Sequence, residues 1–176
     1  EGQNDHYDRQ HQEWNKLPKG SAQVIRSGSV ISHAEKMHKW SHMFQIWLDP
    51  DLSRAIHKPA SYDDYLPDSF SEIENEGQKV KVYAGEGGPM KLDTPGVEIV
   101  EIGFDNGDHK IVLDLEKIHS IYLLNGTASI EGEVIEKGDF VILSDKTEIQ
   151  LSTKDEATIF KISSPVNVNY ATYGQK

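Results

Sequence analysis

The sequence predicts an all-β fold of the jelly-roll kind. Across residues 78–164, eight short runs rich in β-branched and aromatic residues follow one another, and many alternate apolar with polar positions. Turn-forming residues such as Asn125-Gly126 separate these runs. Long amphipathic helical patterns are missing, which argues against a doubly wound sheet. Short strands at this spacing are typical of a β-sandwich or barrel.

The second half of the chain gives the clearest strand pattern. We expect strands at 79–85, 96–104, 109–115, 119–126, 128–135, 139–143, 147–152 and 157–163.

The first half is less regular. Residues 1–20 are polar and turn-rich, whereas 21–28 reads as a short strand that ends at Gly28. The apolar run at 43–48 has the length of a buried strand. Residues 51–76 carry prolines and acids without a sustained period, which indicates a long connection with one short helical turn.

Composition excludes several classes of function. The 176 residues carry a formal charge of −11, so the chain lacks the basic surface needed to bind nucleic acid phosphates directly. No apolar run approaches the length of about 20 residues that a membrane span requires. Cysteine is absent, which removes disulfides and thiolate ligands and fits a cytoplasmic location. We therefore expect a soluble protein without a direct nucleic acid or membrane partner.

The stretch SGSVISHAE contains the strongest candidate site. It places His33 and Glu35 two residues apart, so an extended backbone would point both side chains to one face. An imidazole and a carboxylate on one face can hold a divalent transition metal, with iron and manganese both suitable. The same spacing also fits an ordinary polar pair on a solvated strand, and two ligands alone do not complete a site.

A spacing pattern in the second half resembles the first motif of the cupins. Gly107 is followed after five residues by Leu113-Asp114-Leu115, then after three residues by His119 and after six more by Gly126. In cupins these spacings carry two histidines and a glutamate that bind metal. Here Leu113 and Leu115 stand at the histidine positions and His119 at the glutamate position, so we expect His119 to be a hydrogen-bonded or rim residue.

The second cupin motif is matched in the same way. Gly138 stands at its opening glycine, and Ile149 stands at the position of its histidine. The resemblance thus implies a complete C-terminal cupin barrel whose metal centre is replaced by packing residues.

The beginning of the chain repeats the end of this pattern. Gly2 is followed by a polar segment, Gly20 and a strand. In the same order, Gly126 is followed by a hairpin-like segment, Gly138 and a strand. We therefore expect one complete C-terminal barrel plus a partial N-terminal cupin barrel. The expected division is 1–50 for the partial barrel, 51–76 for the connection, and 77–176 for the metal-free C-terminal barrel with its tail.

Longer segments resemble the pirin family of bicupins. The runs that carry the resemblance are SAQVIRSGSVISHAE, FQIWLDPDLSRAIHKPASY, VKVYAGEGG and SPVNVNYATYG. By this resemblance His33 and Glu35 match the third and fourth metal ligands of the first barrel. The His-Pro-His-Arg-Gly segment that holds the other two ligands in pirins has no match here, so we expect a longer gene product or an upstream half that is disordered or cleaved. The other histidines of this half, to which no ligand role is transferred, are His6, His11, His38, His42 and His57.

The resemblance implies three alternatives for function. In the first, iron or another divalent metal in the intact protein supports a quercetin 2,3-dioxygenase-type oxygenase acting on a small flavonol-like substrate. Glu35 would then be a catalytic ligand that accepts the substrate hydroxyl proton, and Met43, Phe44 and Trp47 would be core or pocket wall. In the second, the protein is a non-enzymatic adaptor that binds a transcription factor or metabolic enzyme. In the third, it is a metal-free truncated remnant. Open sheet edges would also favour a homo-oligomer.

Overall fold

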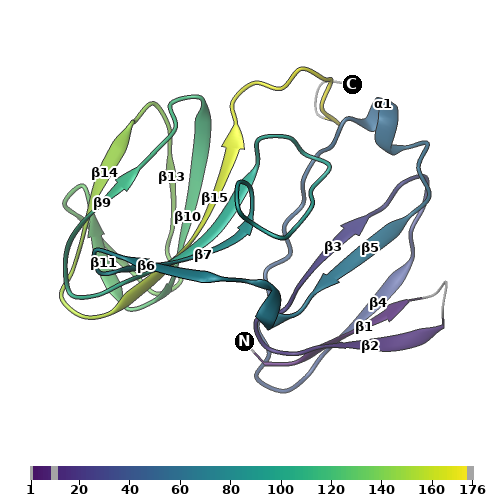
Figure 1. The fold of residues 1–176 in the computed structure, drawn as a ribbon, viewed down its shortest axis with the longest axis horizontal. Helices are drawn as coiled ribbons and strands as arrows, with labels where there is room; N and C mark the ends of the chain where they lie inside the picture. Colours follow the sequence, from purple (N-terminus) through teal and green to yellow (C-terminus); the bar gives the residue numbers. More distant parts are fainter. Residues whose placement is uncertain (1, 9–11, 174–176) are drawn as a thin grey trace. The chain divides into compact units, whose positions relative to one another are not determined.

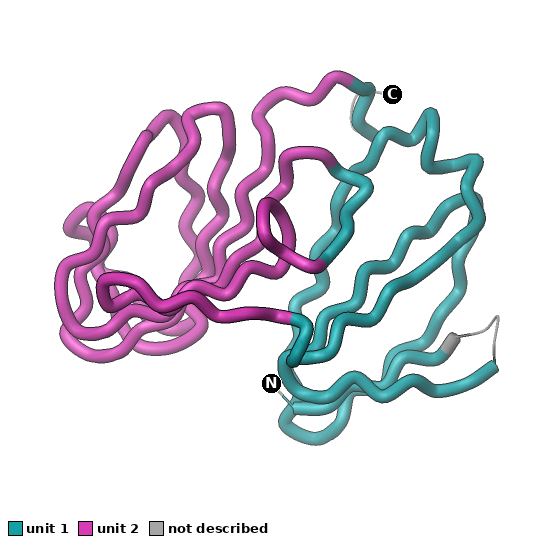
Figure 2. The backbone as a smooth tube through the Cα atoms, viewed as in Figure 1, with its two compact units in different colours: residues 1–69, 90–94, 170–176 teal, residues 70–89, 95–169 magenta. Residues whose placement is uncertain are grey.

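The computed structural model describes residues 2–8 and 12–173, and it divides into two compact units (Figures 1 and 2). The first unit comprises residues 1–69, 90–94 and 170–176. The second comprises residues 70–89 and 95–169. Within the described part of the chain, no helix has the length and apolar character that crossing a membrane requires.

The first unit contains two small antiparallel sheets. One has the strand order β2-β1-β4 and the other pairs β3 with β5. Its elements are β1 (Asn4–Asp8), β2 (Glu13–Leu17), β3 (Ala22–Arg26), β4 (His33–Met37), helix α1 (Leu52–Ala55), β5 (Ser61–Tyr65) and the 3-10 turn η1 (Pro67–Ser69). Leu17 and Val24 are the buried apolar side chains of these strands, so the described part of this unit has a small core.

The second unit is a sandwich of a six-stranded and a four-stranded antiparallel sheet. The sheet orders are β13-β10-β15-β8-β7-β6 and β12-β11-β14-β9. The strands are β6 (Glu72–Asn75), β7 (Gln78–Ala84), β8 (Glu98–Phe104), β9 (Gly107–Val112), β10 (Lys117–Asn125), β11 (Thr127–Ile130), β12 (Glu133–Glu136), β13 (Phe140–Leu143), β14 (Glu148–Thr153) and β15 (Ala157–Pro165).

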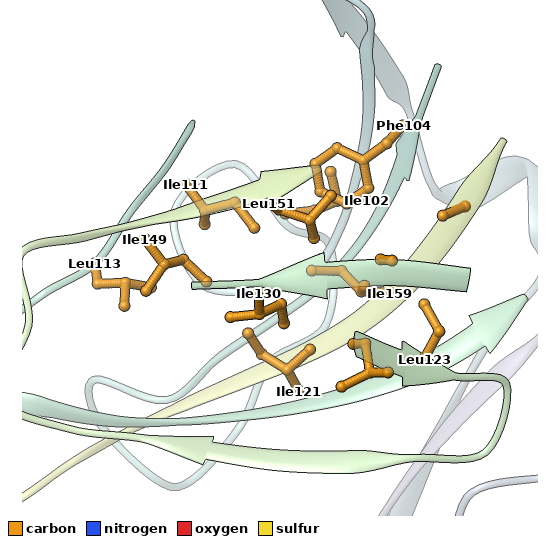
Figure 3. Close-up of a cluster of buried hydrophobic side chains, with 13 residues drawn as sticks. Ile102, Phe104, Ile111, Leu113, Ile121, Leu123, Ile130, Ile149, Leu151 and Ile159 are labelled. Atoms are coloured by element: carbon orange, nitrogen blue, oxygen red, sulfur yellow. The ribbon is translucent and has the colours of Figure 1, made fainter. Parts of the chain in front are cut away.

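Apolar side chains from both sheets fill the sandwich (Figure 3). Ile121 and Leu123 extend from β10, Ile159 from β15, and Ile149 and Leu151 from β14. Each of these side chains is almost completely removed from solvent, and alternate residues of the same strands point outward. Burial of this apolar surface is the main force that stabilises the second unit.

The two units confirm the expected internal repeat. Gly2 precedes the hairpin β1–β2, and Gly126 precedes the hairpin β11–β12. Gly20 and Gly138 then lead into β3 and β13. All four glycines have positive φ, a backbone conformation that side chains with a Cβ rarely adopt. The order β2-β1-β4 also repeats β12-β11-β14, so the first unit repeats part of the architecture of the second.

Most strands expected after residue 78 are present, with one difference. The run 128–135 forms the hairpin β11–β12 rather than a single strand, because Glu131 and Gly132 take positive φ and reverse the chain.

Two expectations for the first half were wrong. Residues 51–76 hold the expected helical turn α1, but they also supply β5, which pairs with β3, and β6, which pairs with β7. The apolar run 43–48 is not a buried strand, because no neighbouring strand pairs with it among the described residues.

Candidate metal centre

Strand β4 places His33 and Glu35 on the same face, as the two-residue spacing predicts. The Nε2 atom of His33 lies 4.0 Å from Oε1 of Glu35, and both side chains remain partly exposed. Two ligands of one transition metal are separated by about 3 Å when each bond is about 2.1 Å long. A small side-chain rotation therefore brings both atoms to one metal ion.

His6 is a third member of this cluster. In the β1–β4 pairing it lies opposite Glu35, and cross-strand partners share a face. Its ring lies 5.3 Å from that of His33, with only 23° between the two planes. His6 is 1% exposed, so it forms the buried floor beneath the more accessible His33. Sequence reasoning missed this role, because only the strand register brings residues 6 and 35 together.

Tyr62 of β5 approaches His6 from the other sheet of the first unit. Their ring centroids are 5.2 Å apart. The side-chain amide of Asn15 donates a hydrogen bond to the hydroxyl of Tyr62 over 3.4 Å. Tyr62, which accepts a hydrogen bond from Asn15, thus packs against His6, and His6 in turn packs against His33.

These residues fit part of a metal site. Within residues 2–8 and 12–173, no group of three or more His, Cys, Asp or Glu side chains is arranged to hold a metal ion. His6 is 1% exposed and stacks on the ring of His33, so we count only His33 and Glu35 as accessible donors. The donor set available here is therefore one imidazole and one carboxylate.

The corresponding positions of the second unit are apolar. We compare the two units by aligning the hairpins after Gly2 and Gly126. In the registers β1–β4 and β11–β14, His6 then corresponds to Ile130. The same registers place His33 at Ile149 and Glu35 at Leu151. Ile130, Ile149 and Leu151 all belong to the buried core cluster. One strand framework thus carries two histidines and a carboxylate in the first unit and apolar packing residues in the second.

The first cupin motif of the second unit has also lost its ligand chemistry. Leu113 is buried in the core, whereas Leu115 lies after β9 and is 54% exposed. His119 is buried, and hydrogen bonds satisfy it as expected: Nδ1 lies 2.8 Å from Oγ of Ser163 and Nε2 lies 3.0 Å from the carbonyl oxygen of Asp114.

A tight turn sets the entry to β4. Gly28 has φ +53°, and a Cβ at this position would overlap the carbonyl oxygen of Lys58. The next residue, Ser29, donates its backbone N–H to that same oxygen over 3.1 Å. Glycine is therefore needed where the chain passes this backbone on its way to His33.

The remaining histidines of the first unit among the described residues are His38, His42 and His57. His38 contacts Oδ2 of Asp5 at 2.8 Å, and Asp5 points to the face of β1 opposite that of His6. His42 and His57 are exposed, and His11 lies outside the described residues.

Met43, Phe44 and Trp47 are not core residues. All three are exposed, and Trp47 is 87% exposed. The expectation that they belong to the core was therefore wrong, whereas a place in a pocket wall stays a prediction.

Comparisons with known proteins support the fold. No family model matches the chain, and no curated protein matches it. Among solved structures, a quercetin 2,3-dioxygenase from Acinetobacter baumannii superposes with a TM-score of 0.76 at 18% identity, over 99% of this chain and 66% of that one. GK1651 from Geobacillus kaustophilus gives a TM-score of 0.78 at 19% identity, over 95% of this chain and 72% of that one.

A pirin is similar to the same extent. The bacterial pirin YhhW from Escherichia coli, solved in complex with nickel(II), gives a TM-score of 0.70 at 19% identity, over 94% of this chain and 69% of that one. The chain therefore spans about two thirds of the length of these proteins. The chain has the cupin fold of the pirins and quercetin 2,3-dioxygenases, with one complete C-terminal barrel and a partial N-terminal one.

Proposed function

We propose that this chain is part of a pirin-like, cytoplasmic bicupin protein with quercetin 2,3-dioxygenase-type oxygenase activity. The observation that carries the proposal is the pair His33 and Glu35, which share one face of β4 at 4.0 Å in a chain with the fold of a quercetin 2,3-dioxygenase. The replacement of both residues by Ile149 and Leu151 in the second unit supports it, because their polarity is not a requirement of the fold.

The residues would have distinct roles. His33 Nε2 and Glu35 Oε1 would hold iron or another divalent metal, and two further donors must come from outside the described residues. Such a metal supplies a Lewis acid at which a flavonol oxygen and dioxygen can meet. Glu35 would also accept the proton of the substrate hydroxyl, because a carboxylate within hydrogen-bond reach can act as a general base. His6 would hold His33 in place from below.

Quercetin consumption together with oxygen uptake tests this function. The protein is loaded in turn with Fe²⁺, Ni²⁺ and Co²⁺, and bound metal is measured on the same samples. We expect turnover with bound metal, and loss of both in His33→Ala. Glu35→Gln should lower turnover more strongly than metal binding, because the amide can still coordinate weakly but cannot accept a proton. Glu74→Gln on β6 is the control and should leave both unchanged. Turnover that survives in both site variants would refute the proposal.

A second function is favoured by one observation. The end of β4 and the segment after it expose a series of large apolar side chains: Met37, Trp40, Met43, Phe44, Ile46 and Trp47. Exposed apolar residues gathered in this way mark interaction surfaces. A pirin-like adaptor that binds a transcription factor or metabolic enzyme would use such a segment, as would a homo-oligomer. Stoichiometric metal without turnover, together with a protein complex that Trp47→Ala abolishes, would favour the adaptor. A metal-free protein that forms no complex would favour the remnant.

A further inference from the structure

The second unit buries a connected group of polar side chains beside its apolar core. On β15, Lys161 and Ser163 continue the inward-facing row of Ala157 and Ile159. His119 of β10 lies opposite Ser163 in the strand register. The exposed fractions of Lys161, Ser163 and His119 are 8%, 0% and 2%. Lysine is almost never buried to this extent unless it is paired with a charge.

Hydrogen-bond contacts connect the side chains of His119, Ser163 and Lys161. Nε2 of His119 lies 3.0 Å from the carbonyl oxygen of Asp114 and 3.3 Å from the amide nitrogen of the same residue. Oγ of Ser163 lies 2.8 Å from Nδ1 of His119 and accepts a hydrogen bond from Nζ of Lys161 over 2.9 Å.

The ammonium group of Lys161 has no ion-pair partner among the described residues. No carboxylate in that part of the chain lies within 4.0 Å of its Nζ, and Ser163 supplies its one hydrogen bond. Glu98, opposite Ser163 on β8, instead pairs with Lys117 at 2.7 Å. Burial lowers the pKa of Lys161; Glu98 opposes this shift and Lys117 adds to it. A buried cation with this environment is stabilised either by losing its proton or by gaining an anion.

We propose that this polar end of the second unit binds a small carboxylate anion, with Lys161 as the cation that contacts it. The two oxygens of a carboxylate can accept the N–H groups of Lys161 that Ser163 leaves unused, in short charge-assisted hydrogen bonds. Ser163 and His119 orient the ammonium group. Glu98 and Lys117 are partly exposed, so the polar end reaches solvent. Lys161 is 8% exposed and Ser163 is 0% exposed, so only a small anion can reach the ammonium group.

Titration of the ¹⁵N-labelled full chain with sodium acetate tests the proposal. Ionic strength is held constant with sodium chloride at pH 7, so that only the identity of the anion changes. We expect saturable shifts of the amide signals of His119, Lys161 and Ser163. Lys161→Met should weaken the affinity at least tenfold, because it removes a charge-assisted hydrogen bond and keeps the length of the side chain.

A matched variant distinguishes this site from a general effect of charge. Lys81 of β7 lies in the same sheet and has carboxylate partners, Glu101 at 3.5 Å and Glu72 at 3.9 Å. Lys81→Met should therefore bind acetate like the wild type. No saturable shift in the wild type, or equal acetate affinity in Lys161→Met, would overturn the proposal.

The unfolding midpoint gives a second measurement that requires no signal assignment. Without acetate, Lys161→Met should unfold at a higher temperature than the wild type, because it removes an uncompensated buried charge. Acetate should raise the midpoint of the wild type but not that of the variant. Equal increases in both proteins would contradict the assignment. Neither measurement depends on metal at His33 and Glu35, so the two proposals stand or fall separately.

Discussion

Replacement of Ile149 by alanine tests whether the second unit has given up a ligand position for packing. Ile149 is 1% exposed and occupies the position that His33 holds in the first unit. Its neighbours in the core include Ile111, Leu113 and Leu151 (Figure 3). The substitution removes three buried carbon atoms and leaves a cavity that close-packed neighbours cannot fill. Because the side chain is fully enclosed, we expect a loss of about 3–4 kcal/mol in the free energy of unfolding.

Denaturant unfolding followed by circular dichroism measures this loss. The control is Val112→Ala on the adjacent strand β9, where the side chain is 74% exposed. Its cost should stay within about 0.5 kcal/mol. Hydrogen exchange of the amides in β10 and β15 should accelerate in Ile149→Ala, because these strands pack on the same core. A cost below about 1 kcal/mol for Ile149→Ala would refute the assignment of this position to packing.

Three other predictions concern the pH response, the turn before β4 and the exposed segment. Burial lowers the folded pKa of His119, so the unfolded state binds its proton first: stability should be full above about pH 6.5 and should fall as the pH drops below it. His119→Gln should reduce that slope in urea titrations between pH 7.5 and 5, and an unchanged slope would contradict the prediction. Gly28→Ala should cost at least about 2 kcal/mol and weaken metal binding at His33 and Glu35, because it combines positive φ with backbone overlap at Lys58; normal stability by denaturant unfolding would count against it. Trp47→Ala should change stability by no more than about 0.5 kcal/mol, because the side chain is 87% exposed, and a larger loss would show that the segment is buried in solution.

The second unit could be predicted well from sequence because its strands show the pattern that burial imposes. In β14, the buried apolar residues Ile149 and Leu151 alternate with polar residues, so periodicity alone locates this strand and its core positions. The glycine spacing also predicted the internal repeat of the two units. This works because Gly2, Gly20, Gly126 and Gly138 all have positive φ, which favours glycine at these turns. These features are local, and a single sequence contains them.

The first unit was harder to predict because its strands lack that pattern. In β1 and β2 the face shared with β4 carries His6 and Asn15, and the other face carries Asp5 and Lys16, so apolar residues do not alternate. The contact of His6 with His33 depends on strand register, which joins residues far apart in the chain. Composition also misled for residues 43–48, because an apolar run becomes a buried strand only where another strand is present to pair with it.

The central claim is that one strand framework holds a metal-ligand pair in the first unit and packing residues in the second. Titration of the ¹⁵N-labelled chain with paramagnetic Ni²⁺ tests it directly. We predict that amide signals of β1 and β4 around His6, His33 and Glu35 broaden first, and that His33→Ala with Glu35→Ala abolishes this broadening. Signals around Leu113, His119 and Ile149 should remain sharp at the same metal concentration. Broadening that begins in the second unit, or that persists at β4 in the double variant, would contradict the account.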